Sequence, residues 1–106
     1  MTVTTTLDPI GTEDIAPGEA VQVQAAGLTL AVFRVGDEFY VTDDQCTHGP
    51  GLLHEGCLTG YEIECDFHQG SFNIRTGEVI EPPCTVALRV YPVTLRDGRV
   101  MIDLPA

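Results

Sequence analysis

The polar and hydrophobic positions of the first 44 residues alternate over short segments and do not recur at helical spacing. Glu19 to Gln24 alternates, Leu28 to Val35 is a longer apolar segment, and Phe39 to Thr42 follows after Gly36-Asp37, a pair typical of tight turns. Segments of this kind, rich in Val, Leu, Thr and Phe and separated by Gly and Pro, predict strands. This part of the chain is therefore expected to form an antiparallel meander.

The same pattern returns near the C-terminus. Ala87 to Leu95 predicts a strand, Asp97-Gly98 predicts a hairpin turn, and Val100 to Leu104 predicts the strand that returns beside it. The one helical turn that the pattern allows lies near Glu13 to Ala16. We therefore predict an all-β, antiparallel protein with little or no helix.

The segment from Gln45 to about Pro83 differs in composition from the rest of the chain. It is rich in Gly, Pro, Cys and His and holds two short predicted strands, Tyr61 to Cys65 and Ser71 to Ile74. A stretch this irregular inside a compact domain is usually functional or held by something other than packing, and a metal centre would supply that stability. We predict a single domain, residues 1–106, in which residues 45–83 form a second lobe inserted into the β base.

Composition limits the classes of function. The chain has 106 residues, 43% of them hydrophobic, with 5 Lys plus Arg against 16 Asp plus Glu and a net charge of -11. It is too apolar for a disordered acidic tail, and its charge opposes binding to nucleic acid or an anionic membrane and favours a basic protein partner. No apolar stretch approaches the ~18 residues that cross a bilayer, and Met1 to Ile10 has no export signal, so we expect a cytoplasmic protein.

Two Cys/His pairs carry the chemistry of the predicted lobe. Cys46 and His48 are followed, after sixteen intervening residues, by Cys65 and His68. If two loops of this kind face each other, the cysteines can bind one metal and the histidines a second, as a [2Fe-2S] centre with two histidine ligands requires. A single structural zinc ion could accept the same four ligands, although mixed zinc sites commonly place two cysteines first and two histidines after them.

The chain resembles the Rieske proteins, and more narrowly the small soluble Rieske-type ferredoxins of bacterial aromatic ring-hydroxylating dioxygenases. The resemblance covers nearly the whole chain. Its most specific segments are Cys46-Thr47-His48-Gly49, Gly60-Tyr61-Glu62-Ile63-Glu64-Cys65, His68-Gln69-Gly70-Ser71-Phe72, Thr76-Gly77 and Arg99-Val100-Met101-Ile102-Asp103-Leu104.

This resemblance implies a Rieske-type β-sandwich base that carries a cluster-binding lobe. It implies that Cys46 and Cys65 bind the buried iron of one [2Fe-2S] cluster and that His48 and His68 bind the outer iron. It also implies a third, proline-bearing loop over the cluster, a position that Glu81-Pro82-Pro83 fits.

The function implied by the resemblance is that of a one-electron carrier without a catalytic site of its own. The implied donor is an NADH-dependent flavoprotein ferredoxin reductase, the implied acceptor is the terminal Rieske oxygenase, and the carrier is a monomer that docks transiently. Two alternatives stay open: a Rieske-like small subunit of a nitrite reductase or another oxidoreductase complex, and a structural zinc module. An oxygenase subunit is excluded, because only His54 remains for the two histidines that a mononuclear iron site needs.

Departures from the high-potential Rieske proteins predict a low potential. Gly51 and Phe67 stand where those relatives carry a pair of disulfide-bonded cysteines, and Gly70 and Phe72 stand where they carry a Ser and a Tyr that donate hydroxyl hydrogen bonds. Without those donors, an acidic protein is expected near the low end of the roughly -150 to +300 mV Rieske range. Ser71 is expected to compensate in part.

Other polar and apolar residues of the lobe receive plainer interpretations. We expect His54 to be a polar surface histidine, and Cys57 and Cys84 to be free, partly buried thiols. Leu52 and Leu53 are equally consistent with simple packing and with an apolar collar around the ligand histidines. Several acidic residues are expected to be solvated and to steer docking together: Asp43, Asp44, Glu55, Glu62 and Glu64.

Overall fold

The computed structural model describes residues 4–47, 51–65, 70–82 and 86–105. Within these ranges the regular structure consists of β-strands and two short 3₁₀ helices, which confirms the predicted all-β class. The elements are β1 (Thr4–Gly11), η1 (Thr12–Asp14), β2 (Ala20–Ala25), β3 (Leu28–Val35), β4 (Glu38–Asp43), η2 (Leu53–Glu55), β5 (Cys57–Thr59), β6 (Glu62–Glu64), β7 (Ser71–Asn73), β8 (Val79–Glu81), β9 (Val90–Tyr91), β10 (Val93–Arg96) and β11 (Arg99–Pro105). No helix in the described part of the chain is long and apolar enough to cross a membrane.

Two antiparallel sheets form the base of the molecule. One has the strand order β1-β11-β10, and the other has the order β2-β3-β4-β9. Buried side chains from both sheets meet in one hydrophobic core, among them Leu30 and Val32 of β3 and Val100 and Ile102 of β11. The inward-facing residues alternate along these strands, as a half-buried antiparallel sheet requires.

Strand β3 is buried on both faces. Leu30 and Val32 point into the core of the base, whereas Ala31 and Phe33 belong to a second core that they share with the lobe. All four residues are at 0% exposure. Double burial explains why this predicted strand is an apolar run without polar alternation, and it makes β3 the element on which the lobe rests.

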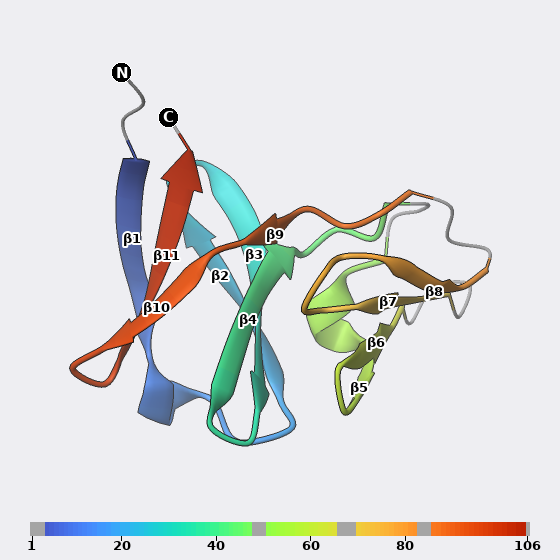
Figure 1. Cartoon of the computed structure of the whole chain (residues 1–106), viewed down its shortest axis with the longest axis horizontal. Coiled ribbons are helices and arrows are strands. Elements are labelled where there is room, and N and C mark those ends of the chain that lie inside the picture. Colours follow the sequence, from blue (N-terminus) through green and yellow to red (C-terminus); the bar gives the residue numbers. More distant parts are fainter. Residues whose placement is uncertain (1–3, 48–50, 66–69, 83–85, 106) are drawn as a thin grey trace.

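The lobe is a separate antiparallel meander with the order β5-β6-β7-β8. It stands at one end of the long axis of the molecule, beside η2, while the start of β1 and the end of β11 lie side by side on the base (Figure 1). Ile63 and Phe72 are direct cross-strand partners in this small sheet and are fully buried against β3. The lobe therefore packs on the base through the apolar face of its own sheet.

The predicted strand over residues 87–95 is wrong in its continuity. The chain forms β9, which pairs with β4, and then β10, which pairs with β11, and Pro92 lies between the two. Proline has no backbone N–H to donate to a ladder, so the break falls where the chain passes from one sheet to the other. The predicted turns are confirmed, with positive φ at Gly36, Asp97 and Gly98.

Candidate functional site

The two Cys-containing loops close in the same way. The backbone N–H of Cys46 donates to the carbonyl of Gly51 at 2.8 Å, and the N–H of Cys65 donates to the carbonyl of Gly70 at 2.7 Å. Each hydrogen bond spans six residues that begin with Cys, end with Gly and include one His in the sequence. The two loops are therefore local structural equivalents, as the paired motifs predict.

Short antiparallel pairs hold the base of each loop. The residues on either side of the first loop pair with each other: Gln45 forms an antiparallel bridge with Leu52, and the N–H of Leu53 donates to the carbonyl of Asp44 at 2.6 Å. The second loop joins β6 to β7, whose register pairs Glu64 with Ser71. Both loops thus extend from paired backbone, which fixes where their cysteines begin.

Both cysteines lie in one core. Cys46 is 2% exposed and Cys65 is 0% exposed, and they share the hydrophobic cluster between β3 and the lobe with Leu53, Ile63 and Phe72. Burial beside apolar side chains is the environment of a ligand sulfur atom that is shielded from water. The other two predicted ligands, His48 and His68, lie outside the described residues.

The donor set fits a [2Fe-2S] cluster of mixed ligation. Two buried cysteines start equivalent loops, and each loop carries one imidazole in its sequence, so sulfur and nitrogen donors come in equal number. Elsewhere in the described ranges, no group of three or more His, Cys, Asp or Glu side chains gathers as a metal site would. The loop pair is therefore the candidate metal centre.

A glycine contact sets the distance between the two halves of the site. A Cβ placed on Gly56, directly after η2, would lie 2.0 Å from the carbonyl oxygen of Glu64, the residue before Cys65. Only glycine allows the chain to approach so closely here. Sequence reasoning missed this role, because nothing local to Gly56 marks it.

A third segment reaches the first loop. The hydroxyl of Thr47 donates to the carbonyl of Val86 at 2.7 Å. Glu81 and Pro82 are exposed, and the side chains of Ile80 and Val86 are exposed apolar groups on either side of the interval 83–85. Pro83, which the sequence assigned to this third loop, lies outside the described residues.

Asp44 and His54 depart from their predicted surroundings. Asp44 is not a solvated charge, because its residue is 0% exposed. Its carboxylate contacts Nδ1 of His54 at 2.6 Å, and the His54 side chain is only 25% exposed. The interpretation of Asp44 as a solvated charge is wrong, because Gln22 of β2 and His54 of η2 hydrogen-bond its carboxylate in the interior, whereas His54 is a half-buried polar residue that still reaches the surface. Leu53 is fully buried, so it packs in the core and forms no collar.

Ser71 does not have the role that we expected of it. Its hydroxyl donates to the Glu62 carboxylate at 2.5 Å, so its single proton is already engaged away from the loops. Phe72 is fully buried and has no hydroxyl to donate. Cys57 is a free thiol but is exposed, and Cys84 lies outside the described residues.

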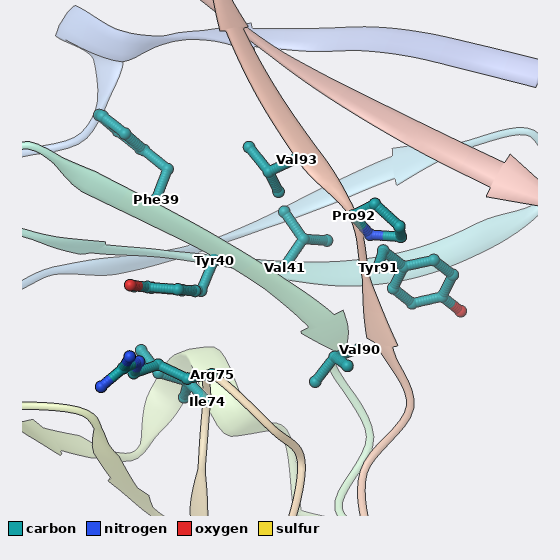
Figure 2. Close-up of a pocket in the computed structure, with 9 residues that line it drawn as sticks. All are labelled: Phe39, Tyr40, Val41, Ile74, Arg75, Val90, Tyr91, Pro92 and Val93. Atoms are coloured by element: carbon teal, nitrogen blue, oxygen red, sulfur yellow. The ribbon is translucent and has the colours of Figure 1, made fainter.

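A groove of about 330 Å³ separates base from lobe. Strand β4 and the β9–β10 segment form one wall, and Ile74 and Arg75 of the lobe lie opposite (Figure 2). At its edge, Glu38 accepts hydrogen bonds from the hydroxyls of Tyr40 and Tyr61, and the Arg75 guanidinium lies 4.8 Å from the Tyr61 ring centroid. This polar cluster joins β4 to the lobe across the groove.

The same contacts shift the ionisation of the cluster. The hydrogen bond to Glu38, followed by desolvation, raises the pKa of Tyr40 to about 12. Hydrogen bonds from Tyr40 and Tyr61 hold the pKa of Glu38 below its ordinary value of 4.5. On the base, desolvation and a 2.5 Å hydrogen bond to Asp43 raise the pKa of Tyr91 to about 12.

Comparison with known proteins agrees with this geometry. Residues 8–92 match the family model of the Rieske [2Fe-2S] domain. The ferredoxin component of the p-cumate 2,3-dioxygenase system of Pseudomonas putida is 45% identical over 97 residues, which cover 90% of this chain and 82% of that protein.

Solved structures give the same result. The Sphingomonas yanoikuyae B1 ferredoxin superposes with a TM-score of 0.90 at 42% identity, covering 95% of this chain and 100% of the other. A chain in the complex of reduced oxygenase and oxidized ferredoxin in carbazole 1,9a-dioxygenase superposes with a TM-score of 0.87 at 46% identity, covering 92% and 91%.

Proposed function

We propose, from the premise that the chain belongs to the Rieske [2Fe-2S] domain family, that this protein is a one-electron carrier of an aromatic-ring dioxygenase system. The observation that carries the proposal is the pair of equivalent loops with their buried cysteines. Its cofactor is a Rieske-type [2Fe-2S] cluster, which accepts and releases one electron when bound. The protein contributes ligands, shielding and charge.

We assign the ligands residue by residue. Cys46 and Cys65 would hold the buried iron, because both start their loops inside the apolar core. His48 and His68 would hold the outer iron, an assignment supported by the spacing of the two motifs. Two neutral imidazoles in place of two thiolates make the centre less negative, which favours acceptance of an electron relative to an all-cysteine cluster.

The potential is proposed to lie toward the low end of the Rieske range. Hydroxyl donors raise such potentials by stabilising the reduced state, and this chain has Gly70 and Phe72 at the two donor positions. Ser71 directs its proton to Glu62. A net charge of -11 adds a field that opposes reduction, although solvent ions screen most of its surface part.

The partners are inferred from the relatives. The matched carbazole system holds its ferredoxin in complex with an oxygenase, so a terminal oxygenase is the proposed acceptor. The proposed donor is an NADH-dependent flavoprotein ferredoxin reductase, placed with the carrier in the cytoplasm. A monomer that must leave quickly needs small, transient interfaces, below about 1,200 Å². Its acidic surface suits basic patches on both partners.

We also propose that residues 1–106 act as one domain whose residues 45–83 are the cluster lobe. The shared core between β3 and the lobe supports this, because lobe and base bury each other's apolar side chains. Denaturant unfolding followed on the cluster absorbance and on the far-ultraviolet circular dichroism should give one coincident transition. Two separate transitions would contradict a single unit.

The experiment that tests the function is visible absorption and electron paramagnetic resonance of the purified protein, before and after dithionite. A coloured protein that bleaches and gives a reduced-state signal with average g clearly below that of all-cysteine ferredoxins supports the mixed cluster. A colourless protein with one equivalent of zinc overturns it. His68→Cys should lower the potential or abolish the cluster, and an unchanged potential would remove His68 from the ligand set.

A stable complex would identify the rival function. A protein that copurifies with a larger reductase at nanomolar dissociation constants is a fixed subunit of that enzyme. A carrier instead elutes alone and still supports turnover when mixed with a reductase and an oxygenase of a dioxygenase system.

A further inference from the structure

Asp44 is the one acidic residue with a fully buried side chain among those that the structure describes. A buried carboxylate is costly unless hydrogen bonds replace its lost hydration. Asp44 has three donors: the side-chain amide of Gln22 at 2.8 Å, the backbone N–H of His54 at 2.8 Å and Nδ1 of His54 at 2.6 Å. The group is therefore built into the structure, with two of its three donors on one residue.

Asp44 and its donor His54 lie on opposite sides of the first Cys-containing loop. Asp44 stands two residues before Cys46, and His54 stands three residues after Gly51. The backbone carbonyl of Asp44 also accepts from the N–H of Leu53. The backbone carbonyl and the carboxylate of Asp44 thus hold the C-terminal end of the first loop. Gln22 links Asp44 to β2 of the base.

The imidazole must act as a donor in this contact. An ionised carboxylate offers acceptors only, so Nδ1 of His54 carries the proton that lies between the two groups. A hydrogen bond of this length to a charged acceptor is of the strong, charge-assisted kind. Apolar side chains of similar volume in place of Asp44 and His54 would pack equally well, and their burial would not carry the desolvation cost of polar groups. A buried carboxylate with hydrogen-bond donors at this place therefore points to a task beyond packing.

We propose, on the basis of the proposed cluster function, that Asp44 and His54 are positioning residues for the first cluster loop. Their pair fixes the loop that presents Cys46, and the hydrogen bond from Nδ1 of His54 holds the Asp44 carboxylate in place beside that loop. The Asp44–His54 pair sets how long the cluster is retained, and it keeps the reduction potential from falling below the low value proposed above. After the second loop, among the residues that the structure describes, the contact is of another kind: the Ser71 hydroxyl donates to Glu62 of the neighbouring strand.

Two substitutions separate the hydrogen bond from the packing. His54→Leu keeps an apolar side chain of similar size and removes the donor, whereas His54→Asn offers an amide donor at nearly the position of Nδ1. Glu55→Ala is the matched control, because Glu55 is the next residue of η2, is exposed, and makes no side-chain hydrogen bond or ion pair with another described residue. Gln22→Leu removes a donor from β2 without touching either loop end.

The readouts are retention of the cluster and its electronic state in the holoprotein. Half-life is measured anaerobically from the visible absorbance under excess chelator, and potential and g values are measured by redox titration with electron paramagnetic resonance. His54→Leu should lose its cluster roughly tenfold faster and show a lower potential and shifted g values, because a strong hydrogen bond to the charge is gone. His54→Asn should restore most of both, and Gln22→Leu should give a smaller change in the same direction.

Each other result has a distinct meaning. Unchanged half-life, potential and g values in His54→Leu, with a wild-type Rieske spectrum, overturn the positioning role and leave the carrier function intact. Faster loss that His54→Asn does not restore, without any shift of potential, also overturns it in favour of packing alone. If His54→Leu does not fold, Gln22→Leu decides by the same criteria. A wild-type protein without a Rieske spectrum overturns the proposed function itself.

Discussion

Substitution of Gly56 by Ala gives a direct test of how the two halves of the site are spaced. The new Cβ would lie 2.0 Å from the carbonyl oxygen of Glu64, and Cβ contacts in real structures do not fall below 3.0 Å, so the two segments must separate by about 1 Å. The three atoms nearest to this Cβ all belong to the backbone of Glu64 or Leu53, so no flexible side chain can move aside to relieve the overlap. Overpacking of this kind costs about 1–3 kcal/mol of folding free energy.

The displacement matters more than the energy, because Glu64 is bonded directly to Cys65. A shift of about 1 Å at that carbonyl is large against the ~0.5 Å tolerance of a preorganised ligand site. Gly56→Ala is therefore expected to fold with reduced stability and to hold clearly less iron per chain than the wild type, with a broadened reduced-state resonance signal.

Gly18→Ala is the matched control. Gly18 lies in the base with a φ of +85° and no atom within 4 Å of a built Cβ, so an alanine there has space but adopts an unfavourable backbone conformation, which costs about 1–2 kcal/mol. Both variants lose comparable stability in urea titration, yet only Gly56→Ala should lose iron. Equal and full iron content in both would refute the spacing argument.

Further predictions concern the core, the ionisation of the tyrosines and the docking. Leu53→Ala should cost about 2–5 kcal/mol in denaturant unfolding, because Leu53 is fully buried beside both cysteines, while Leu95→Ala at a 47% exposed site should cost little. The raised pKa of Tyr91, about 12, means that its share of stability is complete below pH 10 and is lost as the pH rises from 10 to 12. Thermal unfolding against pH should show this loss, and Tyr91→Phe should make it smaller, while the share of Tyr40, whose pKa is also raised to about 12, remains. Oxygenase turnover supported by this carrier should fall as salt rises, since screening weakens attraction between an acidic surface and basic patches; insensitivity between 50 and 500 mM salt, roughly, would contradict electrostatic docking.

Local pattern was sufficient for most strands of the base. Residues 28–35 form β3 with the predicted bounds, and the turns at Gly36 and Gly98 fall where the Gly-Asp and Asp-Gly pairs stand. Strands β5 and β8 of the lobe were not predicted, because three residues carry too few positions for a period to appear. Strands β6 and β7 have the same length and were predicted only because their alternation continues into the flanking residues of the segments 61–65 and 71–74. Strands β5 and β8 exist because short hairpins pair them with their neighbours β6 and β7 and because the resulting sheet packs on the distant strand β3.

Some features of the candidate site can also be predicted from the local sequence, whereas others arise only from the tertiary fold. The equivalence of the two loops is local: six residues from Cys to Gly close one backbone hydrogen bond, so the motif itself contains the geometry. The burial and hydrogen bonding of Asp44 depend on tertiary structure. One of its donors, Gln22 of β2, lies twenty-two positions earlier in the chain, and no spacing rule connects the two residues. A charge next to a metal motif looks solvated in the sequence until the fold shows what covers it.

That distinction bears on the potential as well. The sequence predicts a low value from two missing hydroxyls, but it leaves Ser71 as an adjacent donor that could reverse part of the effect. The register of β6 and β7 places Glu64 opposite Ser71 and Glu62 opposite Asn73, and the Ser71 hydroxyl reaches the Glu62 carboxylate. Glu62→Gln would leave Ser71 with a weaker, neutral acceptor, but it also removes one negative charge, so its reduction potential is compared with that of Glu64→Gln, which removes an exposed charge from the same strand and leaves the Ser71–Glu62 hydrogen bond in place. A potential that rises further in Glu62→Gln than in Glu64→Gln would mean that the released hydroxyl serves the cluster. Equal potentials in the two variants would mean that the absent hydroxyls at Gly70 and Phe72 and the net charge are sufficient causes.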